Sequence, residues 1–383
     1  MVSVLFTAIL AGVVRAPAQA SPGPPGAVVA IAPLGRAWGG LDRVARLSYL
    51  TTDGFGHTVS ASGLVRTPAG TPPPGGWPVV VWTHGTSGLG PDCGLTASTI
   101  AERADSAIVA EVNRAGYAVV APEYLGLSPA DVIAGQRTHP YLQTRSEATA
   151  SADIVRAAHI ALPGLSRRWA VVGVSQGGHA ALATGNVASA RARDLDFRGT
   201  VAMAPASNVE NAILALRPGV PALPAGLTGT VAAILAGMAA NSDDVDVGKY
   251  LTPLGRGIID RISSVCAPDF ASVVGQTPAG RLVSRPLDDP VFAAALRRYM
   301  AVPTTGYDRP ILVVQGFRDA DVPLPLTAAL LGEFAAAGTR YEFRVVDSDH
   351  GDLPWRGGLD AATEFLGRVM DNSAMDNSVM DNN

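Results

Sequence analysis

A serine stands in the sequence Trp169-Ala170-Val171-Val172-Gly173-Val174-Ser175-Gln176-Gly177, directly after an apolar run and directly before a stretch of helix-forming residues. This is the Gly-x-Ser-x-Gly form of a nucleophile elbow, a tight strand-to-helix turn that exposes the serine hydroxyl. The small residues on either side of the serine let such a turn close. The pattern therefore predicts a strand that ends at Val174, a turn at Ser175 and a helix after it.

Two further residues follow Ser175 in the order that a catalytic triad requires. Asp319 comes shortly after the strand-like run 311–314, and His350 comes shortly after the strand-like run 341–346. Ser, then Asp, then His is the chain order found in α/β-hydrolases. Because parallel strands bring their carboxyl ends to one edge of a sheet, we expect these three residues to meet there.

Several carboxylates compete for the place of the triad acid. We prefer Asp319, because it lies three residues after Gly316 at a strand end, and Asp321 is the second candidate. Asp347 and Asp349 are also close in sequence to the predicted histidine. The acid of a triad holds the imidazole in one tautomer and stabilises the imidazolium that forms during the reaction.

The expected chemistry is acyl transfer. A serine hydroxyl is a weak nucleophile until an imidazole removes its proton, so Ser175 would attack and His350 would act as base and then as acid. The tetrahedral oxyanion needs amide donors. We expect one from the backbone of Gln176 and the other from Gly85, which follows the strand-like run 79–83 and has no side chain to obstruct a substrate.

Strand-like and helix-like segments alternate along most of the chain, which indicates a mostly parallel, doubly wound α/β sheet with helices on both faces. The alternation stops between 207 and 304, where apolar helical stretches are separated by many Pro and Gly residues. We interpret 41–206 and 305–370 as an α/β-hydrolase core, and 207–304 as an inserted helical cap (lid) over the active site. The expected strands are 43–51, 58–67, 79–83, 117–121, 169–174, 197–204, 311–314 and 341–346, and the expected helices are 97–114, 146–162, 178–192, 226–240, 289–300, 324–337 and 361–370.

The two ends of the chain have the composition of segments outside a folded domain. Residues 1–20 contain a short apolar run and end in Ala18-Gln19-Ala20, which is typical of a signal peptide with its cleavage site. Residues 21–40, which begin with many Pro, Gly and Ala residues, are expected to be a linker. A five-residue repeat fills 371–383, and so short a unit cannot build a core, so we expect a disordered tail. We expect the protein to be secreted, and an association with the cell envelope stays open.

The composition excludes some classes of function. The net charge of −4 gives no indication of nucleic-acid binding. The acidic loop 244–248 lacks the downstream Glu of a calcium loop, and we expect neither a metal nor an organic cofactor.

The sequence contains two cysteines, Cys93 and Cys266. In a secreted chain an even count favours a disulfide, although two unrelated buried thiols are the alternative.

Three more residues near the predicted site have an open role. Glu123 and Tyr124 follow the strand-like run 117–121, so they either line the site or form a hydrogen-bonded structural pair. His179 lies one turn into the helix after Ser175, and we expect it to support the site or pack behind it.

The chain resembles the secretory lipase family, the α/β-hydrolases of the yeast lipase A type and their bacterial relatives. The resemblance implies an α/β-hydrolase fold with a helical cap and a triad at Ser175, Asp319 and His350. In family relatives a disulfide ties the loop on the oxyanion side to the cap, and Cys93 and Cys266 match those two places. The resembling segments are 82–86 (WTHGT), 116–127 (GYAVVAPEYLGL), 139–142 (HPYL), 145–148 (RSEA) and 169–181 (WAVVGVSQGGHAA).

These observations predict a secreted serine carboxylic ester hydrolase, a lipase or an esterase, that works through an acyl-enzyme. Its partner would be a small ester or lipid substrate, with transient contact to a lipid interface and no protein partner implied. Two alternatives stay open: a serine peptidase or acyltransferase with the same triad, or a non-catalytic binding protein with this fold.

Overall fold

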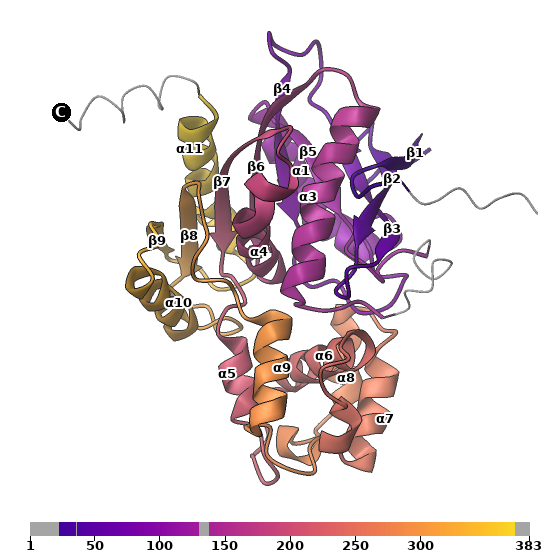
Figure 1. Cartoon of the computed structure of the whole chain (residues 1–383), viewed down its shortest axis with the longest axis vertical. Coiled ribbons are helices and arrows are strands. Elements are labelled where there is room, and N and C mark those ends of the chain that lie inside the picture. Colours follow the sequence, from indigo (N-terminus) through magenta and orange to yellow (C-terminus); the bar gives the residue numbers. More distant parts are fainter. Residues whose placement is uncertain (1–22, 36, 130–137, 372–383) are drawn as a thin grey trace, which may run out of the picture.

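The computed structural model describes residues 23–35, 37–129 and 138–371. The expected signal peptide at 1–20 and the repeat tail from residue 372 lie outside the described residues. Nine strands form one sheet in the order β1-β2-β3-β5-β4-β6-β7-β8-β9 (Figure 1). The strands are β1 (Val28–Pro33), β2 (Ala45–Thr52), β3 (Thr58–Arg66), β4 (Trp77–Thr83), β5 (Ala118–Pro122), β6 (Leu165–Val174), β7 (Asp196–Met203), β8 (Ile311–Gly316) and β9 (Glu342–Val346).

The predicted mostly parallel sheet is confirmed. The six strands from β5 to β9 in the sheet order are parallel to their neighbours. β1, β2 and β3 add an antiparallel edge. The central strands are almost continuous runs of buried apolar residues, as a sheet covered on both faces requires.

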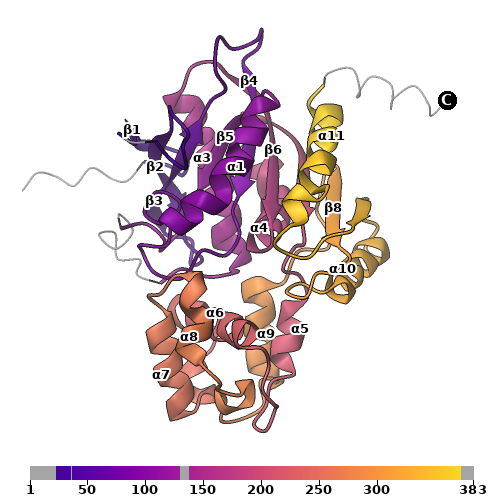
Figure 2. The same cartoon turned by 180° about the vertical axis from the view of Figure 1, so that it is seen from behind.

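Helices cover both faces of the sheet. Side chains alternate along β4: Val79 and Val81 cluster with residues of α3 and α4, whereas Val80 and Trp82 cluster with residues of α1 and α11. Figures 1 and 2 show these two helix pairs on opposite sides of the strands. The core helices are α1 (Thr99–Arg114), α3 (Thr144–Ala161), α4 (Gln176–Arg191), α10 (Leu324–Ala336) and α11 (Gly358–Met370), with the short 3₁₀ helix η4 (Leu353–Trp355).

The predicted helical insertion is present between β7 and β8, and we call it the cap. It lies beyond the ends of the parallel strands (Figures 1 and 2) and has its own apolar core, which includes Ile234, Phe292 and Leu296. Among the helices of the described residues, none combines the length and hydropathy that crossing a bilayer requires. The helices of the cap are α5 (Val209–Leu214), α6 (Ala225–Asn241), η1 (Val247–Tyr250), α7 (Pro253–Ile262), η2 (Ala267–Asp269), α8 (Phe270–Val274), η3 (Ala279–Arg281) and α9 (Pro290–Met300).

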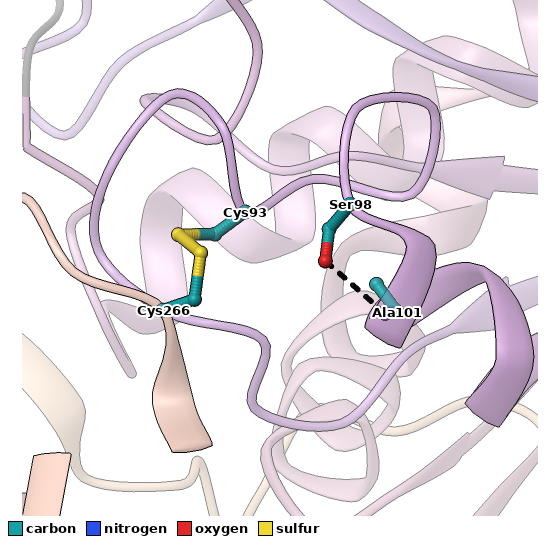
Figure 3. The surroundings of a disulfide bond; sticks show 4 residues. All are labelled: Cys93, Ser98, Ala101 and Cys266. Atoms are coloured by element: carbon teal, nitrogen blue, oxygen red, sulfur yellow. Dashed lines mark hydrogen bonds between the residues drawn. A yellow bond between two sulfur atoms is a disulfide. The ribbon is translucent and has the colours of Figure 1, made fainter. Parts of the chain in front are cut away.

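A disulfide joins the cap to the core. Cys93, in the loop before α1, is bonded to Cys266, directly before η2, and their Cα atoms are 5.2 Å apart. The predicted pairing is therefore confirmed. Figure 3 shows the bond beside the start of α1, where the Ser98 side chain accepts a hydrogen bond from the Ala101 amide. This capping bond fixes the first turn of α1 close to the disulfide.

Two backbone hydrogen bonds reinforce the same junction. The Leu89 amide donates to the Val265 carbonyl (3.0 Å), and the Ala267 amide donates to the Ser87 carbonyl (2.9 Å). The core loop and the cap loop thus pair like two short antiparallel strands around the disulfide. Main-chain hydrogen bonds therefore hold the cap to the core here, in addition to the disulfide.

The prediction of a linker over 21–40 is wrong for β1. Val28–Pro33 pairs antiparallel with β2 at the edge of the sheet, and Trp38 is buried in the core. The run contains β-branched residues, which favour a strand, but the Pro and Gly residues around it led to the prediction of a linker. A proline is tolerated at its end because an edge strand leaves one row of amides unpaired.

Removal of the disulfide should destabilise the protein. The disulfide closes a loop with a sequence separation of 173 residues. In the chain-entropy model, closing a loop of this length adds about 4–5 kcal/mol to the free energy of unfolding. The double variant Cys93→Ala/Cys266→Ala should therefore unfold at lower urea concentration than wild type, as followed by circular dichroism. An unchanged midpoint would contradict this assignment.

Candidate active site

Ser175 occupies a strained turn between β6 and α4. Its φ is +59°, in the left-handed region that non-glycine residues rarely adopt. The neighbouring glycines are required by space: a Cβ on Gly173 would come 2.1 Å from the Gly177 carbonyl oxygen, and one on Gly177 would come 1.8 Å from the Thr83 carbonyl oxygen. The Ser175 amide donates to the Met203 carbonyl (2.9 Å) on the adjacent strand, which fixes the turn. The predicted elbow geometry is present.

The three predicted triad residues lie in one hydrogen-bonded chain. His350 Nε2 is 2.9 Å from Ser175 Oγ, and His350 Nδ1 is 2.7 Å from Asp319 Oδ2. The Asp319 side chain is fully buried, whereas the His350 side chain is 19% exposed. The imidazole therefore has a buried anion on one side and the serine hydroxyl on the other.

Asp319, not Asp321, contacts the imidazole. One carboxylate oxygen of Asp319 accepts hydrogen bonds from the amides of Val322 (2.8 Å) and Asp321 (3.0 Å). The other oxygen faces His350 and also accepts from Gln315 Nε2 (3.3 Å). These donors fix the carboxylate and replace the water that burial removes.

The predicted amide donors lie beside Ser175. Gln176 is the first residue of α4, so its amide has no carbonyl to bond within the helix. Gly85 lines the same cavity as Ser175. The Tyr124 hydroxyl donates to the His84 carbonyl (3.2 Å), which orients the peptide between His84 and Gly85. Because C=O and N–H point in opposite directions in a trans peptide, the Gly85 amide points away from Tyr124.

A cavity of about 1430 Å³ opens next to Ser175 and His350 and continues into the cap. Ligand pockets typically measure about 300–1,000 Å³, so this one has room for a large molecule. On the cap side its wall is apolar, and on α6 the lining residues recur at helical spacing. The cap residues that line it include Val209, Ile213, Leu227, Val231, Ile234 and Phe270.

One wall of the cavity carries a carboxyl that no sequence motif marks. Ala101, Ala104, Asp105 and Ile108 recur at helical spacing on α1 and all line the cavity. Asp105 is 7% exposed, and its Oδ1 accepts a hydrogen bond from Trp82 Nε1 (2.6 Å). Burial raises the pKa of Asp105 to about 7, although the hydrogen bond from Trp82 opposes this shift. A lone acid in an otherwise apolar stripe is the sequence signal that could have identified it.

Glu123 and Tyr124 are both turned into the core. Glu123 accepts hydrogen bonds from the Ser62 hydroxyl (2.7 Å) and from the amide and hydroxyl of Thr96 (2.8 Å each). Tyr124 bonds instead to the His84 carbonyl. Neither lines the cavity around Ser175. They hold the oxyanion-side loop and the strand ends in place, and they do not pair with each other.

Fold and site geometry together define an α/β-hydrolase of the serine type. Within the described residues, no cluster of three or more His, Cys, Asp or Glu side chains is arranged to hold a metal ion. The chain matches the secretory lipase family over residues 92–351, which is more than half of its length. It belongs to that family and is a carboxylic ester hydrolase.

Solved structures share the fold. Lipase A of Candida antarctica superposes with a TM-score of 0.73 at 19% identity, covering 92% of this chain and 84% of that one. The rice cell wall degrading esterase LipA of Xanthomonas oryzae gives a TM-score of 0.69 at 20% identity, covering 91% of this chain and 99% of that one. No curated protein matched the sequence.

Replacement of Asp105 by Asn should stabilise the protein increasingly as pH rises. The folded pKa is raised from the ordinary 3.8 to about 7, so the unfolded chain ionises first and the folded state loses stability as pH rises through this window. Asn keeps the acceptor for Trp82 and never ionises. Relative to wild type, Asp105→Asn should gain about 2–4 kcal/mol in unfolding free energy between about pH 4 and pH 8.

Urea denaturation of both proteins at several pH values measures this difference. Asp153→Asn is the matched control, because Asp153 is paired with Arg191 (2.7 Å) and should lose stability at neutral pH when neutralised. A difference between Asp105→Asn and wild type that stays constant with pH would contradict a raised pKa.

Proposed function

We propose that this chain is secreted and hydrolyses lipid esters through an acyl-enzyme, with Ser175 as nucleophile, His350 as general base and acid, and Asp319 as the orienting acid. The observation that carries the proposal is the continuous chain from Ser175 Oγ to His350 (2.9 Å) to Asp319 (2.7 Å). Its exposed end faces a large apolar cavity. A hydroxyl, a base and a buried anion in this order form a nucleophile that attacks carbonyl carbon.

Each step follows from these positions. Ser175 Oγ attacks the ester carbonyl while His350 Nε2 takes the hydroxyl proton, and the carbonyl oxygen becomes the oxyanion. The C–O bond to the alcohol then breaks, and His350 returns the proton to the departing alkoxide. Water next attacks the acyl-enzyme with His350 again as base, which releases the acid and restores Ser175. Asp319 remains ionised and stabilises the imidazolium in both halves of the cycle.

The amides of Gln176 and Gly85 would bind the oxyanion. Both are main-chain donors next to Ser175, and Gln176 begins α4, whose N-terminal end carries partial positive charge. Donors that are fixed before the reaction need no rearrangement as the negative charge develops. We assign to them the electrostatic part of the rate acceleration.

The cap side of the cavity is the proposed site of the acyl chain. It is apolar and large, so an extended hydrocarbon can replace water there, at a gain of about 0.8 kcal/mol per buried CH₂. Leu223 and Trp355 line the same cavity and are 39% and 50% exposed. Exposed apolar side chains at its rim support transient contact with a lipid interface.

Secretion is supported by three independent features. The family is described as secretory, a disulfide connects cap and core, and residues 1–20 have the pattern of a signal peptide. Disulfides of this kind persist in oxidising compartments outside the cytosol. The proposed division of the mature protein is a cap at 207–304 and a core at 41–206 and 305–370, to which β1 (Val28–Pro33) adds an edge strand.

Replacement of Ser175 by Ala should abolish hydrolysis of p-nitrophenyl esters. Without the hydroxyl no acyl-enzyme can form, and loss of a triad nucleophile costs on the order of 10⁶ in kcat. Wild type should hydrolyse an ester series from acetate to palmitate, including the long chains that the cavity accommodates. The circular dichroism spectrum of the variant controls for folding.

A second variant tests where the acyl chain binds. Val231 lines the cap side of the cavity, and Val231→Trp would fill part of it. Hydrolysis of the palmitate ester should fall by about 10-fold or more relative to hydrolysis of the acetate ester.

Two outcomes would refute the proposed function. One is ester hydrolysis that survives in Ser175→Ala, and the other is cleavage of amino acid p-nitroanilides without any ester hydrolysis.

A further inference from the structure

Four polar side chains form a connected network behind Ser175. His139, Glu147, Gln176 and His179 are each no more than 1% exposed. Gln176 Nε2 lies 2.7 Å from His139 Nε2 and 2.8 Å from Glu147 Oε1, and Glu147 Oε2 lies 2.7 Å from His179 Nδ1. A buried polar group without a partner lowers the stability of the fold. Each of these contacts therefore helps to fix the positions of the four side chains.

The hydrogen-bond partners fix His139 as neutral. Its Nδ1 faces the Leu125 carbonyl (2.9 Å) and must donate to it. Its Nε2 therefore accepts a hydrogen bond from Gln176 Nε2. Burial lowers the pKa of His139 to about 3, in agreement with this tautomer. Gln176 is thus held by an acceptor on each side, His139 and Glu147.

The partners of His179 require two protons on its ring. Nδ1 faces the Glu147 carboxylate, and Nε2 lies 2.8 Å from the Met300 carbonyl, so both nitrogens must donate. Burial alone would lower the pKa of His179, but Glu147 and the hydrogen bonds raise it above the ordinary value. The pair is therefore an imidazolium and a carboxylate, both fully buried.

This ion pair also connects the nucleophile helix to the cap. Met300 is the last residue of α9, and its carbonyl has no partner within the helix. A cation at a helix C-terminus is favourable because the end of the helix carries partial negative charge. The carbonyl of Tyr299, next to it, accepts from the Thr144 hydroxyl (3.3 Å) at the start of α3. The returning end of the cap is thus fixed against α3 and α4.

The entry of the cap carries a second buried acid, Glu210. Glu210 lies in the first turn of α5, where the chain enters the cap. Burial raises the pKa of Glu210, and the charge of His179 opposes that shift. The hydrogen bond of His179 to Met300 holds the exit of the cap, at the end of α9.

We propose that Glu147 and His179 are positioning residues, which hold the Gln176 amide in place to bind the oxyanion and fix the end of α9, where the chain leaves the cap, against the nucleophile helix. The proposal rests on the proposed function, because it assigns a purpose to the Gln176 amide in that reaction. Neither residue lines the cavity, so neither touches substrate. Their effect passes through the Gln176 side chain and through α4.

Glu147→Gln tests the charge with almost no change in shape. Without the carboxylate, His179 loses its counter-ion and its second proton, and it can no longer donate to both partners. Gln176→Leu is the second variant, which removes both side-chain contacts of Gln176 and leaves the ion pair intact. If Glu147→Gln does not fold, Gln176→Leu still tests whether this side chain positions the amide.

Asp153→Asn is the matched control. Asp153 is a fully buried carboxylate that also joins α3 to α4, through Arg191, and it accepts a hydrogen bond from Thr51 (2.8 Å). It does not line the cavity or contact Gln176. It should therefore report the loss of stability that follows from breaking an α3–α4 ion pair without a change at the oxyanion site.

The measurements are kcat and KM for p-nitrophenyl butyrate, and the rate of inactivation by diethyl p-nitrophenyl phosphate, whose phosphoryl oxygen takes the place of the oxyanion. A displaced amide stabilises the oxyanion of the transition state less well, but it does not change the binding of substrate. Glu147→Gln and Gln176→Leu should lower kcat and the inactivation rate together by about 10-fold or more, with KM little changed. Asp153→Asn should lower the melting temperature while kcat stays near the wild-type value.

One result would overturn the proposal: a Glu147→Gln or Gln176→Leu protein that is less stable, like Asp153→Asn, but has wild-type kcat and inactivation rate. The network would then be structural only. A failure of the proposed function would look different, because ester hydrolysis would then survive in Ser175→Ala or be absent from the wild type. The two failures are therefore separable in the same set of assays.

Discussion

The structure depends on one strained turn. Ser175 has a positive φ at the junction of β6 and α4, a conformation that costs about 1–3 kcal/mol and persists only when its surroundings hold it. Gly173 and Gly177 let the adjacent backbones approach, and the Thr83 hydroxyl donates to the Gly177 carbonyl (2.7 Å). The turn directs the serine hydroxyl out of the sheet edge. It also makes Gln176 the first residue of a helix, where its amide is left without an internal partner.

The rest of the molecule is arranged around that turn. Parallel pairing of β6, β7 and β8 brings the ends of these strands to one edge, so Asp319 can reach the imidazole that bonds Ser175. The cap closes the space beyond this edge and is attached on two sides. The disulfide at Cys93 holds one side, and the imidazolium of His179 holds the end of α9 on the other. The active-site cavity is lined by residues of the cap and of the core on either side of Ser175 and His350.

Much of this arrangement could be predicted, because the signals are local or follow chain order. The elbow at Ser175 and the strand–helix alternation depend on residues that are neighbours in sequence. β1 (Val28–Pro33) was not recognised, because Pro and Gly residues surround its short β-branched run and its pairing with β2 is not visible in the sequence. The raised pKa of Asp105 and the pairing of Glu147 with His179 could not be predicted from the sequence. Their environments arise only when helices packed on the sheet bring distant residues together.

The central claim is that Ser175 forms a covalent bond with substrate during turnover, and mass spectrometry tests it directly. After inactivation by an alkyl p-nitrophenyl phosphonate, tryptic cleavage at Arg168 and Arg191 should release peptide 169–191 with one phosphonyl group. The account predicts a single addition on Ser175, in proportion to lost esterase activity. Modification of another residue, or full loss of activity with Ser175 unmodified, would contradict it.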